Sequence, residues 1–379
     1  MKVTSVRPVL VDRYLLVEVE TDEGLTGVGE SGTWAFQRAA AEVVRYFGEY
    51  LVGKDPLQIE HHWQYLYRAF HFRGAVIMGA LSAIDIALWD IAGQYHGVPV
   101  HSLLGGPTRA KARVYRHVFG ASREDLVRGC AEAKAAGFNA VGHLTPFVDA
   151  PRSEPFETTS VGQLEWAVES VRQYREAVGS SVDLCIEIHR QLSPAQAIAL
   201  GRELEQFRPM FYEDPVLPDN FDEMALVAEK VAIPIATGER LHTVQEFEML
   251  LRRGAVQYVR PDVCMCGGIT GARKVAAVAE ANHVGVVPHN PLSPVSTVAC
   301  LHLAAAIANF AIQEYPLAED EAPKAEIVSP VPKRDGAYLL VPTAPGLGIA
   351  LVPGGEQKYP FRDRELVTRL HADGSVVDQ

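Results

Sequence analysis

From residue 113 onward, short apolar runs alternate with helix-patterned stretches, and this alternation limits the possible folds more than any other feature. The eight runs are 114–118, 140–144, 182–188, 210–213, 233–237, 258–262, 284–288 and 310–313. They are apolar on both faces, which is typical of strands buried in a parallel sheet. Eight such strands separated by helices predict a TIM-type α/β barrel in preference to an open sheet.

The segments on either side of this region have different patterns. Residues 9–20 alternate like a strand, residues 35–72 are helical in pattern, and residues 75–95 form a long apolar stretch with many small side chains. These features predict an α+β domain over residues 1–112, followed by the barrel over 113–330. The Pro- and Gly-rich remainder, 331–379, is expected to form short strands that pack back on the first domain.

Ionisable side chains end six successive apolar runs. They are Glu187, Glu213, Glu239, Asp262, His289 and Glu314, spaced 26, 26, 23, 27 and 25 residues apart. Each interval is the length of one strand–helix unit. Because the carboxyl ends of barrel strands meet at one mouth, where barrel enzymes carry their catalytic groups, these six side chains are expected to face one cavity.

Three neighbouring carboxylates in that set require compensation. A single acid after a strand is commonly a helix cap, but Glu187, Glu213 and Glu239 together would repel one another without a cation. Ligation by oxygen alone selects a hard ion, so the sequence predicts one Mg²⁺, with Mn²⁺ as the alternative. The six strand-end groups therefore indicate a metal-dependent enzyme.

Two histidines near the predicted cation supply an acid and a base. His189 lies two residues beyond Glu187, so strand alternation places both side chains on one face. His289 ends the seventh run, where Asp262 of the sixth is placed to orient its imidazole. Glu314 would donate a hydrogen bond to the reacting substrate if the neighbouring acids raise its pKa.

Composition excludes several other classes of function. The net charge of −12 argues against a nucleic-acid partner, which requires a basic surface. Five cysteines without paired CxxC units argue against a structural zinc site or a disulfide framework and predict buried free thiols. No signal peptide or apolar stretch suited to span a membrane is apparent, so a cytoplasmic location is expected.

The motifs, taken together, resemble one family. They are 80–93 (ALSAIDIALWDIAG), Glu187-Ile-His189-Arg, Tyr212-Glu213-Asp-Pro, Ala236-Thr-Gly-Glu239-Arg, Arg260-Pro-Asp262, Pro288-His289-Asn, Gln313-Glu314-Tyr and Pro345-Gly-Leu-Gly. Over nearly its full length the chain resembles the mandelate-racemase subgroup of the enolase superfamily, particularly its galactonate dehydratases. This resemblance implies a modified (β/α)7β barrel, capped by the N-terminal segment and the C-terminal tail.

The resemblance also implies a reaction. Acid-sugar dehydratases remove the C2 proton of an aldonate, such as galactonate, gluconate or mannonate, or of an aldarate, and eliminate the 3-hydroxyl. His289 with Asp262 would be the base and His189 the acid, while Glu239 and Glu314 would also act on the substrate. Alternatives are an epimerase or cycloisomerase that uses the same enediolate, and a non-catalytic sugar-acid sensor.

Some residues match only part of the family. His117 and Arg260 occupy positions that contact substrate in mannonate dehydratases, although buried hydrogen bonds would explain them equally well. Trp34 and Arg73 of the N-terminal domain are candidates to select substrate, against roles as a core side chain and a solvated charge. Related enzymes form dimers to octamers, so a homo-oligomer is expected.

Two departures from the family pattern qualify these expectations. Glu187 stands where those dehydratases usually have aspartate. The second run ends in Val141-Gly-His143-Leu, without the Lys-x-Lys pair that racemases of the superfamily use as a base. A long loop over residues 145–159 is a candidate to close over the mouth.

Overall fold

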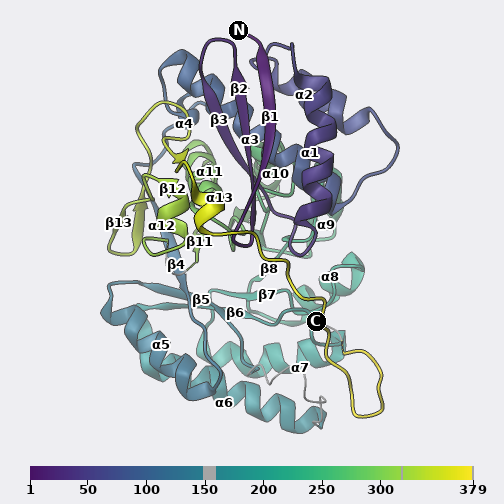
Figure 1. The fold of residues 1–379 in the computed structure, drawn as a ribbon. Coiled ribbons are helices and arrows are strands. Elements are labelled where there is room, and N and C mark those ends of the chain that lie inside the picture. Colours follow the sequence, from purple (N-terminus) through teal and green to yellow (C-terminus); the bar gives the residue numbers. More distant parts are fainter. Residues whose placement is uncertain (148–158, 317–318, 378–379) are drawn as a thin grey trace.

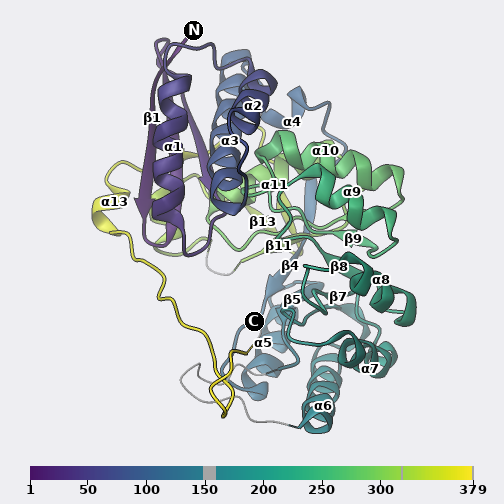
Figure 2. The same ribbon diagram turned by 90° about the vertical axis from the view of Figure 1, so that its right-hand side faces the viewer.

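The computed structural model describes residues 1–147, 159–316 and 319–377. Figures 1 and 2 show a cap formed by the N-terminal segment beside an α/β barrel, and a C-terminal segment that runs from the cap toward the barrel. The predicted barrel with an α+β cap is therefore confirmed. Most of the long loop proposed to close over the mouth lies outside the described residues.

The cap is an antiparallel sheet packed against helices. Its strands, β1 (Val3–Val11), β2 (Tyr14–Thr21) and β3 (Thr26–Ser31), pair in chain order. Its helices are α1 (Gln37–Leu51), α2 (Ile59–Arg68), α3 (Ala75–His96) and the short α4 (Val100–Leu103). A Cβ added at Gly29 of β3 would lie 1.8 Å from the carbonyl oxygen of Ala83, so only glycine allows α3 to approach the sheet this closely.

Eight parallel strands form the barrel, and seven helices alternate with them in the described residues. The strands are β4 (Lys111–His117), β5 (Ala140–Leu144), β6 (Asp183–Glu187), β7 (Phe211–Glu213), β8 (Ile235–Thr237), β9 (Tyr258–Val259), β10 (Gly285–Val286) and β11 (Gln313–Tyr315). The helices are α5 (Arg123–Ala135), α6 (Ser160–Val178), α7 (Pro194–Leu204), α8 (Phe221–Lys230), α9 (Val244–Arg252), α10 (Gly268–Ala281) and α11 (Pro294–Ala306).

Pairing between the first and last strands closes the barrel. Neighbouring strands pair in parallel from β4 through β10, β11 pairs with β4, and Val286 bridges to Phe310 next to β11. Closure brings the carboxyl ends of all eight strands to one mouth. The (β/α)7β arrangement therefore places the six strand-end groups at the same end of the barrel.

The C-terminal segment contacts both the barrel and the cap. After α12 (Lys324–Ile327), β12 (Val328–Ser329) pairs with β15 (Ala350–Leu351), and β13 (Arg334–Asp335) pairs with β14 (Tyr338–Leu340). β14 also pairs antiparallel with the start of β4, whereas Pro360, beyond α13 (Gly355–Lys358), bridges to Val11 of β1. The segment therefore joins the two parts of the chain.

Two buried carboxylates of the cap hold the first turns of barrel helices. Asp85 of α3 accepts the backbone N–H of Thr270 in α10 at 3.0 Å. Glu30, at the end of β3, accepts hydrogen bonds from the N–H and hydroxyl of Ser293 and from the N–H of Ser296 at the start of α11. Helix N-termini favour negative charge. Because α10 and α11 follow the strand ends that carry Asp262 and His289, these contacts also fix the position of that pair.

Replacing Glu30 with glutamine is expected to lower the melting temperature and to weaken its dependence on pH. Burial raises the pKa of Glu30 to about 7, against the hydrogen bonds from Ser293 and Ser296. A carboxyl whose folded pKa is raised stabilises the fold below its unfolded pKa, and this contribution is lost as pH rises through the folded value. The amide removes that titration and supplies only one acceptor oxygen.

Differential scanning fluorimetry between about pH 5 and pH 8 measures both effects, because this window contains the folded pKa. Glu246→Gln is the matched control, since the Glu246 carboxylate accepts hydrogen bonds from His242 and Thr243 at the N-terminus of α9 but is only partly buried. A Glu30→Gln protein with the same pH slope as the wild type would contradict the role of Glu30.

Two expectations from composition have clear outcomes. All five cysteines are free and buried, as predicted. By length and composition α3 could cross a membrane, contrary to the expectation that no stretch would qualify, and it contains Asp85 and Asp90. However, 78% of its apolar window is buried inside the protein, where it forms the central helix of the cap.

Candidate active site

Three glutamates from consecutive strands meet at the barrel mouth. Glu187 ends β6, Glu213 ends β7, and Glu239 lies two residues beyond β8. One carboxylate oxygen from each lies within 4.8 Å of the others. Burial raises the pKa of Glu213 well above its ordinary value, and the neighbouring carboxylates add to this effect. Buried carboxylates so close together fit a cation held by oxygen ligands.

Two arginines from strand ends support this trio. Arg190 contacts Glu239 and donates a hydrogen bond of 2.9 Å to Asp214, the residue after Glu213. Arg260 is 1% exposed; its Nε forms an ion pair with Glu213 without the alignment of a hydrogen bond, and its Nη1 donates to the Tyr115 hydroxyl at 2.8 Å. These contacts fix the orientation of two of the three carboxylates.

His289 and Asp262 form the predicted pair. The Nδ1 of His289 lies 2.8 Å from Oδ2 of Asp262, whose other oxygen accepts the backbone N–H of Cys264. The Nε2 of His289 lies 3.4 Å from Glu239. Burial lowers the pKa of His289, but the surrounding carboxylates, led by Glu239, outweigh burial and raise it to about 9. Asp262 therefore orients the ring so that Nε2 points toward the glutamates.

His189 lies on the Glu187 side of the trio. Its Nε2 is 4.0 Å from Oε1 of Glu187, and its side chain is 27% exposed. The backbone N–H of His189 donates to the same carboxylate at 2.9 Å. His189, Arg190, Asp214 and His143 all have positive φ angles, between 41° and 66°. Such conformations are uncommon outside glycine and gather at functional sites, which fits the position of these residues at the mouth.

The raised pKa on which hydrogen-bond donation by Glu314 depends is not found. Burial alone would raise it, but Arg260, His289 and His117 outweigh burial and lower the pKa of Glu314 well below its ordinary value. Its carboxylate accepts hydrogen bonds of 2.7 Å from Arg260 and from the backbone N–H of Asn290. Glu314 is therefore an acceptor in these contacts, which also fix the positions of Arg260 and Asn290.

The other predicted site residues have different surroundings. His117 is buried, with its Nε2 2.6 Å from Glu314. Arg260 is also buried and directs its guanidinium to protein groups, among them Glu314. Both residues therefore belong to the strand-end cluster through Glu314. Trp34 lies against Arg13 and Arg364, and Arg73 lies 4.2 Å from the centre of the Tyr67 ring. These partners belong to the cap and the C-terminal segment, so the structure does not bring Trp34 or Arg73 into the strand-end cluster.

Three residues that contact the predicted site residues have no role predicted from the sequence: Arg190, Asn290 and His143. The His143 ring stacks on His117 at 4.9 Å between centroids and meets His189 edge to face at 4.7 Å. Burial lowers the pKa of His143 well below its ordinary value. The sequence signal that could have pointed to His143 is its position near the end of the second apolar run, 140–144. Arg190 and Asn290 directly follow the predicted His189 and His289, but a position next to a site residue does not by itself indicate a function.

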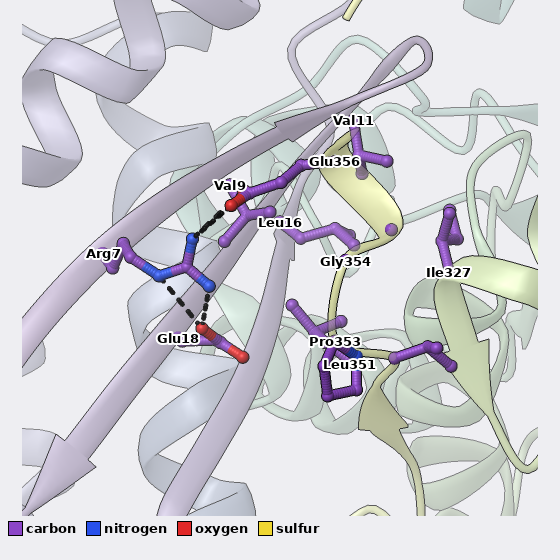
Figure 3. Close-up of a pocket in the computed structure, with 12 residues that line it drawn as sticks. Arg7, Val9, Val11, Leu16, Glu18, Ile327, Leu351, Pro353, Gly354 and Glu356 are labelled. Carbon is purple, nitrogen blue, oxygen red and sulfur yellow. Dashed lines mark hydrogen bonds and ion pairs between the residues drawn. The ribbon is translucent and has the colours of Figure 1, made fainter. Parts of the chain in front are cut away.

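A separate cavity lies in the cap, away from these groups. Its volume is about 250 Å³. Figure 3 shows the residues that line it, which come from β1, β2 and the C-terminal segment around α13. Its walls include Val9, Leu16 and Ile327, and its Arg7 is paired with Glu18 and Glu356. None of the six strand-end groups lines this cavity, so we do not assign the active site to it.

Comparison with known proteins agrees with this geometry. Residues 2–105 match the model of the mandelate racemase/muconate lactonizing enzyme N-terminal domain, and residues 125–354 match the enolase C-terminal domain-like model. The chain belongs to the enolase superfamily. Its place in the mandelate-racemase subgroup, expected from the strand-end motifs, is confirmed.

Its relatives are similar over the full chain. It is 36% identical to a D-galactonate dehydratase of Ralstonia pickettii, covering 100% of both chains. It is 37% identical to one of Xanthomonas euvesicatoria, covering 97% of this chain and 96% of the relative. A solved enolase from Agrobacterium radiobacter, with bound Na and L-malate, has a TM-score of 0.91 at 29% identity over 100% of both chains. The chain is accordingly an enzyme of the hydro-lyase class.

Proposed function

We propose that this enzyme dehydrates a sugar acid, with a galactonate-like aldonate as the first candidate substrate. The main observation in support is that the two histidines lie beside different members of the glutamate trio. His289, which Asp262 orients, lies beside Glu239, and His189 lies beside Glu187. Full-length similarity to D-galactonate dehydratases supports the choice of substrate class. The products are water and a 2-keto-3-deoxy sugar acid.

His289 is the base in this proposal. Its Nδ1–H donates to the carboxylate of Asp262, which leaves the lone pair of Nε2 to accept the C2 proton. The negative charge of Asp262 stabilises the imidazolium that results. Positive charge on Arg260 and Arg190 holds Glu213 and Glu239 in place during the transfer.

His189 is the acid. Its partly exposed imidazole donates a proton to the 3-hydroxyl as the C3–O bond breaks, and water leaves. The resulting enol then ketonises: C3 takes a proton from solvent and the 2-hydroxyl loses its own. His289 releases the C2 proton to solvent and His189 is reprotonated from it, so the enzyme returns to its starting state.

Glu187, Glu213 and Glu239 would hold the cation, Mg²⁺ in this proposal and Mn²⁺ as the alternative. When bound, it would supply the positive charge that makes a proton next to a carboxylate acidic enough to remove. His117 remains a candidate to contact substrate near Glu314, with Trp34 and Arg73 as more remote candidates. A cytoplasmic homo-oligomer stays a prediction.

Removing divalent cations with EDTA is expected to abolish turnover and to lower the melting temperature, because the buried trio would lose its compensating charge. Added Mg²⁺ should restore both. Glu213→Gln should weaken this Mg²⁺-induced stabilisation, whereas Glu229→Gln on the exposed surface of α8 should leave it unchanged. Full activity in the metal-free enzyme would contradict the proposed role of the trio.

A library of four- to six-carbon aldonates and aldarates, assayed with Mg²⁺ for 2-keto acid formation, tests the function itself. We expect turnover of at least one member, galactonate first. Deuterium incorporation at C2 without water loss would instead indicate an epimerase or cycloisomerase. Substrate binding without either reaction would indicate a sugar-acid sensor and overturn the proposal.

A further inference from the structure

A second group of ligand atoms lies beside the glutamate trio. His143, at the end of β5, and His189, beyond the end of β6, each place a ring nitrogen near a carboxylate oxygen of Glu187, with all three atoms within 4.8 Å of one another. The two rings meet edge to face at 4.7 Å. Glu187 therefore belongs both to an all-oxygen group and to a group with two nitrogen ligands.

The two groups differ in the cation that they favour. Three carboxylates suit a hard ion such as Mg²⁺. Two imidazoles with one carboxylate suit a borderline transition ion, and His₂Glu is an established ligand set for Zn²⁺. A carboxylate can bridge two metal ions about 3.5–4 Å apart, so shared use of Glu187 does not require one ion to displace the other.

Charge at the mouth favours a further cation. Six carboxylates gather there, Glu187, Glu213, Asp214, Glu239, Asp262 and Glu314. They are opposed by the guanidiniums of Arg190, Arg240 and Arg260 and by the imidazole of His289. One divalent cation brings this group close to neutrality, and a substrate carboxylate makes it negative again. A second divalent ion would lower the remaining repulsion.

Geometry selects this group over a neighbouring one. His117, His143 and Glu314 also come within 4.8 Å, but His117 and Glu314 already share a hydrogen bond of 2.6 Å that an ion would have to break. His189 is 4.0 Å from Glu187, too far for a hydrogen bond, and is 27% exposed. Two tetrahedral ligands of Zn²⁺ lie about 3.3 Å apart, so a small inward movement of these side chains would complete the site.

We propose that His143, His189 and Glu187 form a second cation site, selective for Zn²⁺ and similar borderline transition ions, that shares Glu187 with the hard-ion site. An ion there occupies the ring nitrogen with which His189 would donate its proton. Zinc should therefore inhibit the enzyme while Mg²⁺ remains bound. The inhibition rests on the proposed dehydration, but the binding does not.

Cobalt(II) is the binding probe, because its visible absorption is intense in four- and five-coordinate sites with nitrogen ligands and weak in six-coordinate oxygen sites. We expect one equivalent of Co²⁺ to give an intense spectrum with the full-length enzyme in excess Mg²⁺, and His143→Asn to abolish it. His283→Asn is the matched control, since His283 is exposed and, like His143, has a positive φ (57° against 50°), which asparagine tolerates.

A weak spectrum alone, or an intense one that survives in His143→Asn, would overturn the proposal. Retained stabilisation by Mg²⁺ shows that the His143→Asn protein is folded with its trio intact. This measurement needs no turnover, so it decides the site even if the proposed dehydration fails.

Zinc inhibition is the second readout. At fixed excess Mg²⁺, the inhibition constant for Zn²⁺ should rise by about tenfold or more in His143→Asn, since losing even an outer-shell partner of a metal weakens binding by this much. His283→Asn should match the wild type. Inhibition that is relieved by more Mg²⁺ and is unaffected by the change at His143 would mean that zinc acts at the trio, which contradicts the second site.

Discussion

Replacing His289 with asparagine is expected to lower kcat for dehydration by about 10²- to 10⁴-fold, the usual contribution of a positioned general base. The amide can keep a hydrogen bond to Asp262 in place of Nδ1, which lies 2.8 Å from that carboxylate. It has no basic atom at the position of Nε2. The loss should therefore fall on proton abstraction and leave the metal site intact.

Steady-state kinetics with the best substrate of the acid-sugar library measures this loss of kcat. Exchange of the C2 proton in deuterium oxide shows whether the loss lies in the proton-abstraction step. Exchange should fall along with kcat, while Mg²⁺-induced stabilisation is retained. His283→Asn serves again as the control for a histidine outside the site. Undiminished C2 exchange in His289→Asn would assign proton abstraction to another group.

The same pair predicts a direction for the pH profile. A base acts when unprotonated, so the rate should rise with pH through the pKa of His289. Carboxylates, among them Glu239 and Asp262, raise that pKa against burial. Asp262→Asn removes one of these charges and should move the rising limb of kcat/KM to lower pH, with a lower maximum rate.

The barrel was predictable because each of its signals is local. A buried parallel strand is apolar on both faces, and eight such runs with intervening helices admit few topologies. The convergence of Glu187, Glu213 and Glu239 then follows from the rule that carboxyl ends of barrel strands share one mouth. Neither step needs knowledge of a specific side-chain contact.

What could not be predicted depends on contacts between distant elements. A raised pKa was the condition for a donor role of Glu314, and it is not met because the guanidinium of Arg260 lies 2.7 Å away, a contact that the sequence does not show. In the sequence, Glu30 and Asp85 are ordinary polar residues of the N-terminal domain. Only the structure shows that they accept hydrogen bonds at the N-termini of α11 and α10. His143 gains significance only from its distances to His189 and Glu187.

Arg260→Met is expected to destabilise the protein by about 3–5 kcal/mol, the usual cost of breaking a buried ion pair by removing one partner. Arg260 lies between Glu213 and Glu314, and all three side chains are at most 3% exposed. Methionine approximates the length of the side chain and keeps its apolar contacts, but it leaves Glu213 and Glu314 without their guanidinium partner and the Tyr115 hydroxyl without its donor.

Thermal and urea unfolding, with and without Mg²⁺, measure this effect. Arg113→Met is the matched control, because Arg113 is also on a barrel strand and pairs with Asp183 at 2.7 Å, but both side chains are partly exposed and such pairs contribute only about 0–1 kcal/mol. Mg²⁺ should recover part of the loss in Arg260→Met, since a cation on the trio compensates Glu213 but not Glu314. Equal losses of stability in the two variants would mean that the buried ion pairs of Arg260 contribute no more than an exposed pair. If Mg²⁺ recovers none of the loss in Arg260→Met, Glu213 is not a ligand of the cation.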